Sequence, residues 1–153
     1  MLTLPETSVS TSPEETFDVG RLIGEGLSVG DAVLLTGGLG AGKTLLTRGI
    51  VDALGFDIEE VTSPSFTLVN LYRTDSFDIY HIDLWRIDKT SDVAFAVGLD
   101  EIADNEKNIV IIEWANQLGG FDFHGNVFRV SIEGDGNDPR TITIDIENAR
   151  EAG

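Results

Sequence analysis

Apolar and polar side chains alternate most clearly near the end of the chain. Two runs carry the pattern, at Phe128, Val130 and Ile132 and again at Ile142, Ile144 and Ile146. Alternation with a period of two is typical of strands that bury one face. Residues 134–139, which separate the two runs, contain glycine and proline. The pattern therefore predicts a C-terminal β-hairpin.

Shorter apolar runs earlier in the chain predict further strands. Residues 32–36 and 109–112 are almost uniformly apolar and too short for helices, which favours buried strands. Residues 65–72 and 77–84 alternate in part and are separated by a turn at residues 74–76. These two segments predict another pair of strands.

Residues 12–15, Ser-Pro-Glu-Glu, predict the N-terminus of a helix. Ser12 can cap the free backbone amides, Pro13 suits a first helical turn, and Glu15 can complete a capping box. The apolar residues that follow keep a helical stripe, so we expect this helix to end near Gly30.

Two more segments, residues 44–54 and 91–104, have the spacing of helices. The first is followed by Gly55, a residue suited to ending a helix. Strands and helices thus alternate along the chain. This order favours one mixed α/β domain over residues 1–153.

Composition narrows the class of protein. The chain has 153 residues, 41% of them hydrophobic, and no cysteine, so we expect neither disulfides nor thiolate metal sites. No apolar run reaches the length that a membrane span needs, and residues 1–12 are polar and lack the basic residues of a signal peptide. We expect a cytoplasmic protein that does not contact a membrane.

The chain is strongly acidic, with 27 Asp and Glu against 10 Lys and Arg and a formal net charge of −17. Nucleic acids bind through Lys and Arg that neutralise phosphates, so we expect RNA to be contacted only through a partner. The charge either maintains solubility or forms an acidic face for a partner. The sequence leaves both interpretations open.

Residues 37–44, Gly-Gly-Leu-Gly-Ala-Gly-Lys-Thr, match the phosphate-binding pattern G-x-x-x-x-G-K-S/T between a predicted strand and a predicted helix. The glycines let backbone amides point at phosphate oxygens, and the helix directs its positive end at the same anion. Lys43 is expected to bridge the terminal phosphates, and the Thr44 hydroxyl to ligate magnesium. We therefore expect ATP with Mg²⁺, contacted by Gly38, Leu39, Gly40, Ala41, Gly42, Lys43, Thr44 and Leu45.

The choice of ATP over GTP follows from the rest of the sequence. The Asn-Lys-x-Asp run typical of guanine-binding proteins does not occur in it. A magnesium nucleotide also recruits carboxylates from neighbouring strand ends. Asp83 and Glu113 each follow an apolar run and are the candidates, although each also fits an ordinary solvated strand end. The sequence does not rank metal binding against water positioning for either acid.

Three more residues admit two interpretations each, and Arg140 has a single default interpretation. His81 lies on a predicted buried strand, which favours a hydrogen-bonded core residue over a general base. Trp114 fits core packing or stacking on a purine, and core packing is slightly favoured. Arg86 fits a phosphate contact or a local ion pair, and Arg140 is expected in a surface salt bridge.

Four motifs, in their order and spacing, resemble the TsaE family of bacterial ATPases of tRNA threonylcarbamoyladenosine synthesis. They are Gly-Leu-Gly-Ala-Gly-Lys-Thr at 38–44, Ser-Pro-Ser-Phe-Thr-Leu-Val at 63–69, His-Ile-Asp-Leu-Trp-Arg at 81–86 and Ile-Glu-Trp at 112–114. The resemblance implies a P-loop NTPase-like fold of three α/β/α layers with a mixed, mostly parallel central sheet. It also implies weak ATP hydrolysis together with TsaD-like and TsaB-like proteins, which modify adenosine 37 of tRNAs reading codons that begin with A. In that complex tRNA is contacted only indirectly.

For the site, the resemblance implies catalytic roles for Lys43, Asp83 and Glu113. It implies that Thr44 and the two acids hold the metal, with Glu113 the stronger candidate. It also places Trp114 near the nucleotide, which reverses the preference for core packing.

The family likeness extends to two flanking segments and has three departures. Residues 63–67 resemble a switch that senses the γ-phosphate, and the segment around Pro13 is expected to border the adenine. Gly38 stands where an acid or Asn is common, Ser65 where Thr is usual and Trp85 where Tyr is usual. A small-molecule kinase and a nucleotide-gated binding module without turnover are the alternative functions.

Overall fold

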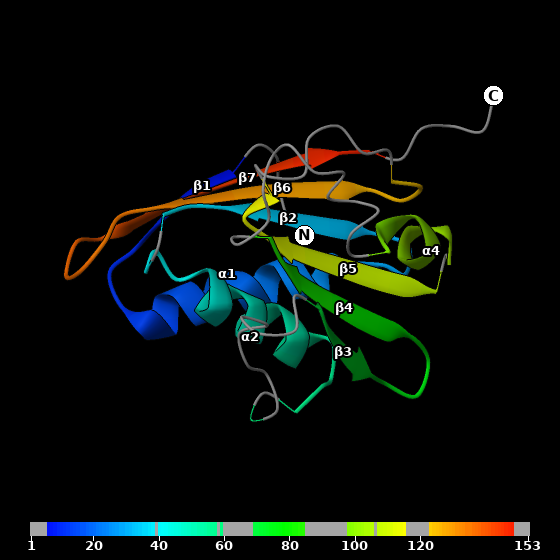
Figure 1. Cartoon of the computed structure of the whole chain (residues 1–153). Coiled ribbons are helices and arrows are strands. Elements are labelled where there is room, and N and C mark those ends of the chain that lie inside the picture. Colours follow the sequence, from blue (N-terminus) through cyan, green and yellow to red (C-terminus); the bar gives the residue numbers. More distant parts are fainter. Residues whose placement is uncertain are drawn as a thin grey trace.

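The computed structural model describes residues 6–38, 40–57, 59, 69–84, 98–105, 107–115 and 123–148. Within these ranges seven strands form one sheet in the order β1-β7-β6-β2-β5-β4-β3 (Figure 1). The strands are β1 (Glu6–Ser10), β2 (Ala32–Thr36), β3 (Val69–Arg73), β4 (Asp78–Asp83), β5 (Asn108–Glu113), β6 (Val127–Glu133) and β7 (Arg140–Glu147). The helices are α1 (Pro13–Glu25), α2 (Lys43–Ala53) and α4 (Leu99–Asp104).

The centre of the sheet is parallel and its edges are antiparallel. Strand β2 pairs in parallel with both β5 and β6, and β4 pairs in parallel with β5. The pairs β1–β7, β6–β7 and β3–β4 are antiparallel. The predicted mixed sheet and the predicted C-terminal hairpin are both confirmed.

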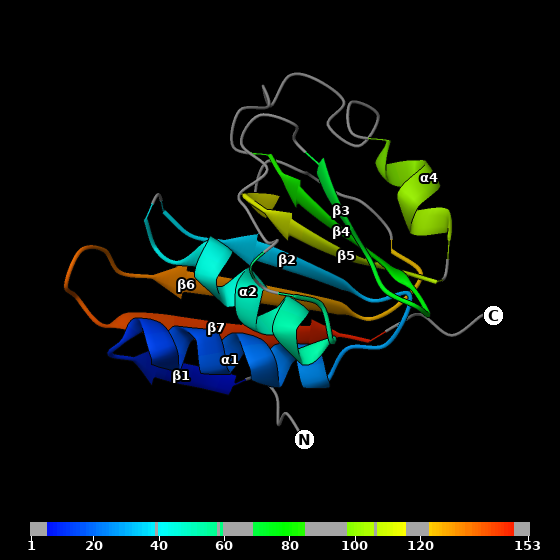
Figure 2. The ribbon, with the colours of Figure 1, turned by 90° about the horizontal axis from the view of Figure 1, so that it is seen from below.

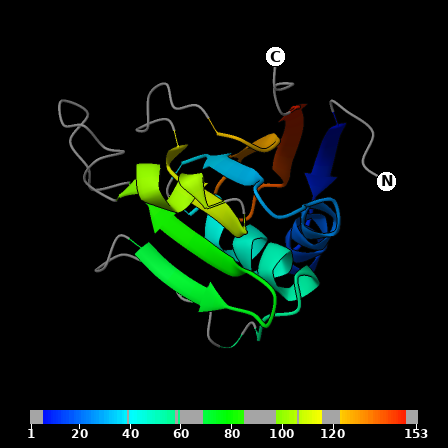
Figure 3. The same cartoon turned by 90° about the vertical axis from the view of Figure 1, so that its right-hand side faces the viewer.

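Helices cover both faces of this sheet, and Figure 2 looks onto the face that carries α1 and α2. Helices α1 and α2 lie side by side on one face, over a core cluster that includes Val33, Leu35, Ile111, Phe128 and Val130. Helix α4 lies against the other face (Figure 3), where the core cluster includes Leu34, Leu99, Val110 and Ile112. The central strands β2 and β5 are therefore buried on both sides, as their nearly uniform apolar sequences predict.

The start of α1 follows the predicted capping pattern with one difference. The Ser12 hydroxyl accepts a hydrogen bond from the Glu15 backbone amide at 3.1 Å. The Glu15 carboxylate does not close the box on Ser12 itself, because it accepts from the Thr11 backbone amide at 3.1 Å and from the Thr11 hydroxyl at 2.8 Å. The helix ends at Glu25, earlier than the expected end near Gly30.

Several boundaries differ from the sequence-based expectation. Strand β1 was not predicted, because its five residues carry no buried hydrophobic stripe: Val9 is 62% exposed. Helix α4 begins at Leu99 and β3 at Val69, and the earlier parts of both predicted segments lie outside the described residues. In the described part of the chain, no helix is long and apolar enough to span a membrane.

Candidate nucleotide and metal site

The glycine-rich loop leads from the end of β2 into α2, as the motif predicts. Gly40 and Gly42 have positive φ angles of 78° and 111°, a region that only glycine adopts without strain. Gly42 is also the N-cap of α2 and makes no side-chain capping bond. The loop thus presents backbone amides at the positive end of the helix, the arrangement that binds phosphate. Leu39 lies outside the described residues.

Lys43 is folded back under its own loop. The side chain is buried, and Nζ donates to the Gly37 carbonyl at 2.8 Å and to the Gly38 carbonyl at 2.7 Å. The same Nζ lies 4.1 Å from the centroid of the Trp114 ring. Burial lowers the pKa of Lys43, and the Glu113 and Asp83 carboxylates oppose that shift. The ammonium is therefore held at the loop, close to both acids.

The two candidate acids end neighbouring parallel strands. Asp83 ends β4 and Glu113 ends β5, and they are paired directly in the β4–β5 register. Glu113 also pairs with Leu35 near the end of β2. Both carboxylates are buried, so the interpretation of solvated strand ends is wrong. They lie at the carboxyl edge of the sheet, where open α/β folds bind ligands.

Thr44 and Glu113 meet across this edge. Thr44 Oγ1 donates to Glu113 Oε1 at 3.3 Å. Among the described residues no three or more His, Cys, Asp and Glu side chains gather around a ready-made metal position. One hydroxyl and two carboxylates fit Mg²⁺, which keeps several waters and uses nucleotide phosphates to complete its shell. The oxygen donors present thus suit a nucleotide-bound magnesium ion.

The structure bears on His81 and Trp114, for which the sequence allowed two interpretations each. His81 is fully buried, with Nε2 against Glu113 Oε2 and Nδ1 3.0 Å from the Tyr72 hydroxyl. This confirms the hydrogen-bonded core residue. Trp114 has a φ of 59°, in the left-handed region. Its ring lies against the Lys43 ammonium, and backbone strain of this kind is common at functional sites.

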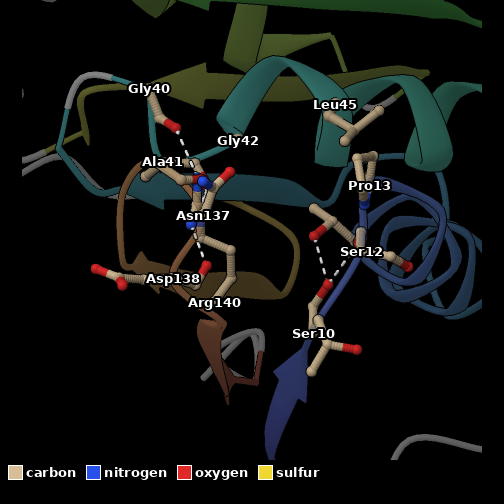
Figure 4. Close-up of a pocket in the computed structure, with 13 residues that line it drawn as sticks. Ser10, Ser12, Pro13, Gly40, Ala41, Gly42, Leu45, Asn137, Asp138 and Arg140 are labelled. Atoms are coloured by element: carbon tan, nitrogen blue, oxygen red, sulfur yellow. Dashed lines mark hydrogen bonds between the residues drawn. The ribbon is translucent and has the colours of Figure 1, made fainter.

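A pocket of about 340 Å³ opens beside the loop (Figure 4). Its walls come from the segment that leads into α1, from the loop and the start of α2, and from the turn between β6 and β7. Pro13 and Leu45 line it, so both lie where an adenine-binding segment is expected. Ser10 and Thr16, both buried, also line the pocket, and their hydroxyls share a hydrogen bond of 2.7 Å.

Arg140 also lines this pocket, and its predicted surface salt bridge is wrong. Its Nε donates to the Ala41 carbonyl at 2.9 Å, and its Nη2 donates to the Gly40 carbonyl at 3.3 Å and to the Gly136 carbonyl at 3.2 Å. Two carbonyls of the loop are thus bound by a donor from another strand. The available signal was modest: a lone arginine that opens a strand directly after a Gly-rich turn.

The structure thus gathers most residues that the sequence singled out. Lys43, Thr44, Asp83, Glu113 and Trp114 lie together at the loop and the neighbouring strand ends. Residues 63–67, Trp85 and Arg86 lie outside the described residues. The roles assigned to these side chains remain predictions.

Comparison with known protein families gives a consistent match. Residues 10–142 match the family model described as Threonylcarbamoyl adenosine biosynthesis protein TsaE. A Rickettsia felis protein named tRNA threonylcarbamoyladenosine biosynthesis protein TsaE is 36% identical over 107 residues, which are 70% of this chain and 61% of that protein. The Bacillus subtilis protein of the same name is 32% identical over 135 residues, which are 88% of this chain and 82% of that protein.

A solved structure extends the likeness to the fold. The crystal structure of Bacillus subtilis YdiB aligns with a TM-score of 0.70 and 28% identity, and the alignment covers 94% of this chain and 86% of that chain. The chain therefore shares its fold with YdiB over nearly its whole length, while it spans less than two thirds of the Rickettsia felis protein.

Proposed function

This chain belongs to the TsaE family, and we propose that it is an ATP-binding, weakly hydrolysing P-loop ATPase of tRNA threonylcarbamoyladenosine biosynthesis. Its relatives carry that pathway in their names. One observation supports nucleotide binding above all. Lys43, the Thr44 hydroxyl and the Glu113 carboxylate meet at the N-terminus of α2, directly after a glycine loop. This is the set of groups that holds a magnesium nucleotide in P-loop proteins.

The proposal assigns each part of the nucleotide to a part of the site. The loop amides and Lys43 hold the phosphates, whose oxygens replace the Gly37 and Gly38 carbonyls as acceptors for Nζ. The adenosine enters the neighbouring pocket between Pro13 and Leu45. Pro13 and Leu45 offer apolar surface to a base, and the lining also contains polar residues, among them Ser12 and Asp138.

We assign the two buried acids to binding Mg²⁺ and to orienting the attacking water. Glu113 contacts Thr44 and is assigned with it to Mg²⁺, which supplies positive charge at the β- and γ-phosphates. Asp83 lies beside Glu113 in the register of the sheet, where its carboxylate adds to the metal shell or orients the attacking water.

The first experiment measures nucleotide affinity. Lys43→Ala removes one charge-assisted phosphate contact, so ATP binding should weaken by about 2–3 kcal/mol, roughly 30- to 140-fold. Isothermal titration calorimetry with Mg²⁺ measures this directly. Lys107→Ala is the matched control, because Lys107 is exposed and lies at the opposite end of β5. Equal ATP affinity of Lys43→Ala and wild type would refute the phosphate site.

The second experiment tests the pathway and the partners. We propose that the chain works in the cytoplasm with TsaD-like and TsaB-like proteins. Adding these purified partners and tRNA should raise ATP hydrolysis and restore repeated rounds of adenosine modification. ATP-dependent association without hydrolysis would instead support a nucleotide-gated binding module. Transfer of phosphate to a metabolite would support a small-molecule kinase and contradict the proposal.

A further inference from the structure

Four polar side chains form a continuous chain from the N-terminus of α2 to the edge of the sheet. Thr44 Oγ1 donates to Glu113 Oε1 at 3.3 Å, and Glu113 Oε2 contacts His81 Nε2. His81 Nδ1 in turn lies 3.0 Å from the Tyr72 hydroxyl. The two oxygens of one carboxylate thus face two different neighbours, one on the metal side and one in the core.

This arrangement is costly unless every member has a partner. His81 is fully buried and Glu113 is 3% exposed. A carboxylate in such surroundings keeps its orientation only where hydrogen-bond donors fix it, because buried polar groups lose water. On the core side, the described contact of Glu113 Oε2 is the imidazole. His81 is therefore placed to decide how the carboxylate is turned.

The hydrogen-bond roles follow from the chemistry of the groups. An ionised carboxylate can only accept, so the His81 nitrogen that faces it carries a proton. In a neutral ring Nδ1 is then the acceptor, and the Tyr72 hydroxyl donates to it. Tyr72 comes from β3 and is buried. It also packs on Phe56, with ring centroids 4.9 Å apart. The Tyr72 end of this series of hydrogen-bonded side chains is therefore anchored in the core.

We propose that His81 is a positioning residue of the metal site: its Nε2–H binds one oxygen of Glu113 and so directs the other oxygen to Thr44 and Mg²⁺. Tyr72 fixes the ring from behind. The inference rests on the proposed magnesium-nucleotide function. It adds that His81 orients a metal-binding carboxylate through the oxygen that faces the core. Such outer-shell partners typically change metal affinity by about ten- to a hundredfold when removed.

Two substitutions of His81 separate the contact from the fold. The amide nitrogen of His81→Gln reaches the position of Nε2 and keeps a donor on Glu113. That of His81→Asn reaches only the position of Nδ1 and leaves the carboxylate without its donor. Both place an amide in the same buried site, so a merely structural role lowers the thermal stability of both alike.

The readout is the affinity of Mn²⁺ for the protein–ADP complex, measured by electron paramagnetic resonance. We expect His81→Asn to weaken Mn²⁺ binding about ten- to a hundredfold and His81→Gln to stay near wild type. Wild-type Mn²⁺ affinity in folded His81→Asn would overturn the inference. If wild type itself binds neither ADP nor Mn²⁺, the proposed function fails, which is a different result.

A second measurement needs no substitution of His81. The chain contains two histidines, His81 and His124, so ¹⁵N-histidine spectra are simple, and His124→Gln assigns them. A proton on His81 Nε2 in the nucleotide-free protein supports the proposal. A bare Nε2 would overturn it, because that nitrogen could not donate to Glu113. This test remains decisive if His81→Asn does not fold.

Discussion

Arg140 and the phosphate-binding loop meet although 99 residues separate Arg140 from Ala41. The guanidinium donates to the Ala41 and Gly40 carbonyls. Each carbonyl belongs to the same rigid peptide unit as the following amide. Fixing the Ala41 carbonyl therefore fixes the direction of the Gly42 N–H, one of the amides that the loop offers to phosphate. Arg140 acts on the shape of the loop as well as on the wall of the pocket.

This contact predicts a loss of affinity in Arg140→Gln. Removing charged donors to the loop carbonyls should weaken ADP binding by about 1.5 kcal/mol, roughly tenfold. Calorimetry of ADP binding checks it. Arg129→Gln is the matched control, since Arg129 pairs with Glu147 on the exposed face of the hairpin. Identical ADP affinities for both variants would mean that the loop keeps its shape without Arg140.

Residues of the site were predictable to the extent that their partners are close in sequence. The loop, Lys43 and Thr44 form one local motif, whose geometry the glycines dictate. Arg140 was misassigned because its acceptors are backbone carbonyls, which no side-chain pattern reveals. Trp114 was ambiguous for a similar reason: its positive φ of 59° and the contact of its ring with Lys43, 71 positions earlier in the sequence, leave no mark in the local sequence pattern.

At the scale of elements, the position of α2 depends on a close contact with α1. A Cβ at Gly49 would lie 2.1 Å from the Phe17 carbonyl oxygen, and one at Gly20 would lie 2.2 Å from the Leu46 carbonyl oxygen. Backbone atoms cannot yield as flexible side chains do. The two helices can therefore approach this closely only because both positions lack a side chain.

Gly49→Ala should separate the helices and lower stability. Overpacking of this kind costs about 1–3 kcal/mol. The gain of about 1 kcal/mol in helix propensity offsets this cost only at its low end, so a net loss of stability is expected. The free energy of unfolding in urea measures the change. Leu22→Ala on the half-exposed face of α1 serves as the control and should change it by about 0.5 kcal/mol or less. An unfolding free energy above wild type would show that the helices separate at no cost.

Asp31 joins three strands at the end of the sheet opposite the site. Its carboxylate accepts from the Ser28 amide at 2.9 Å and the Asn126 amide at 3.0 Å, and its carbonyl accepts from the Val110 amide at 3.2 Å. Burial raises the pKa of Asp31 above its ordinary value of 3.8, although the two amide hydrogen bonds act in the opposite direction.

The raised pKa predicts a pH dependence of stability. Between 3.8 and the higher folded-state pKa, the folded state binds more protons than the unfolded state. The contribution of Asp31 to the unfolding free energy therefore falls as pH rises through this window. Asp31→Asn does not titrate, so the unfolding free energy of wild type minus that of Asp31→Asn should decrease and then level off. Urea titrations at a series of pH values measure this difference, and a difference that increases with pH would contradict it.

Elements were predictable where their own residues carry a buried stripe. The hairpin β6–β7 alternates and was found, as were β2, β5 and α2. Strand β1 was missed because pairing with β7 makes it a strand, with Ser8 opposite Ile142 in the register. Its own side chains are mostly polar. An edge strand of this kind is specified by backbone hydrogen bonds to a distant segment, which hydrophobic periodicity does not report.

For the whole molecule, the net charge distinguishes direct binding of tRNA from contact with tRNA through partner proteins. The sheet and its two helical layers follow from the alternation of apolar runs, and the net charge of −17 follows from composition alone. Composition does not reveal where a partner docks. The negative charge nevertheless predicts that the chain repels RNA, because RNA phosphates carry charge of the same sign.

The chain alone should therefore leave tRNA unbound even at low salt, where electrostatic attraction is strongest. Electrophoretic mobility shifts at increasing protein concentration measure this, with a basic protein of similar size as the positive control. Adding TsaD-like and TsaB-like proteins should retain the labelled chain together with tRNA, because the partners supply the phosphate contacts. A shift by the chain alone that weakens with added salt would reveal a basic binding surface and contradict indirect contact. A shift that appears only with both partners and ATP would instead tie tRNA engagement to the nucleotide site at Lys43.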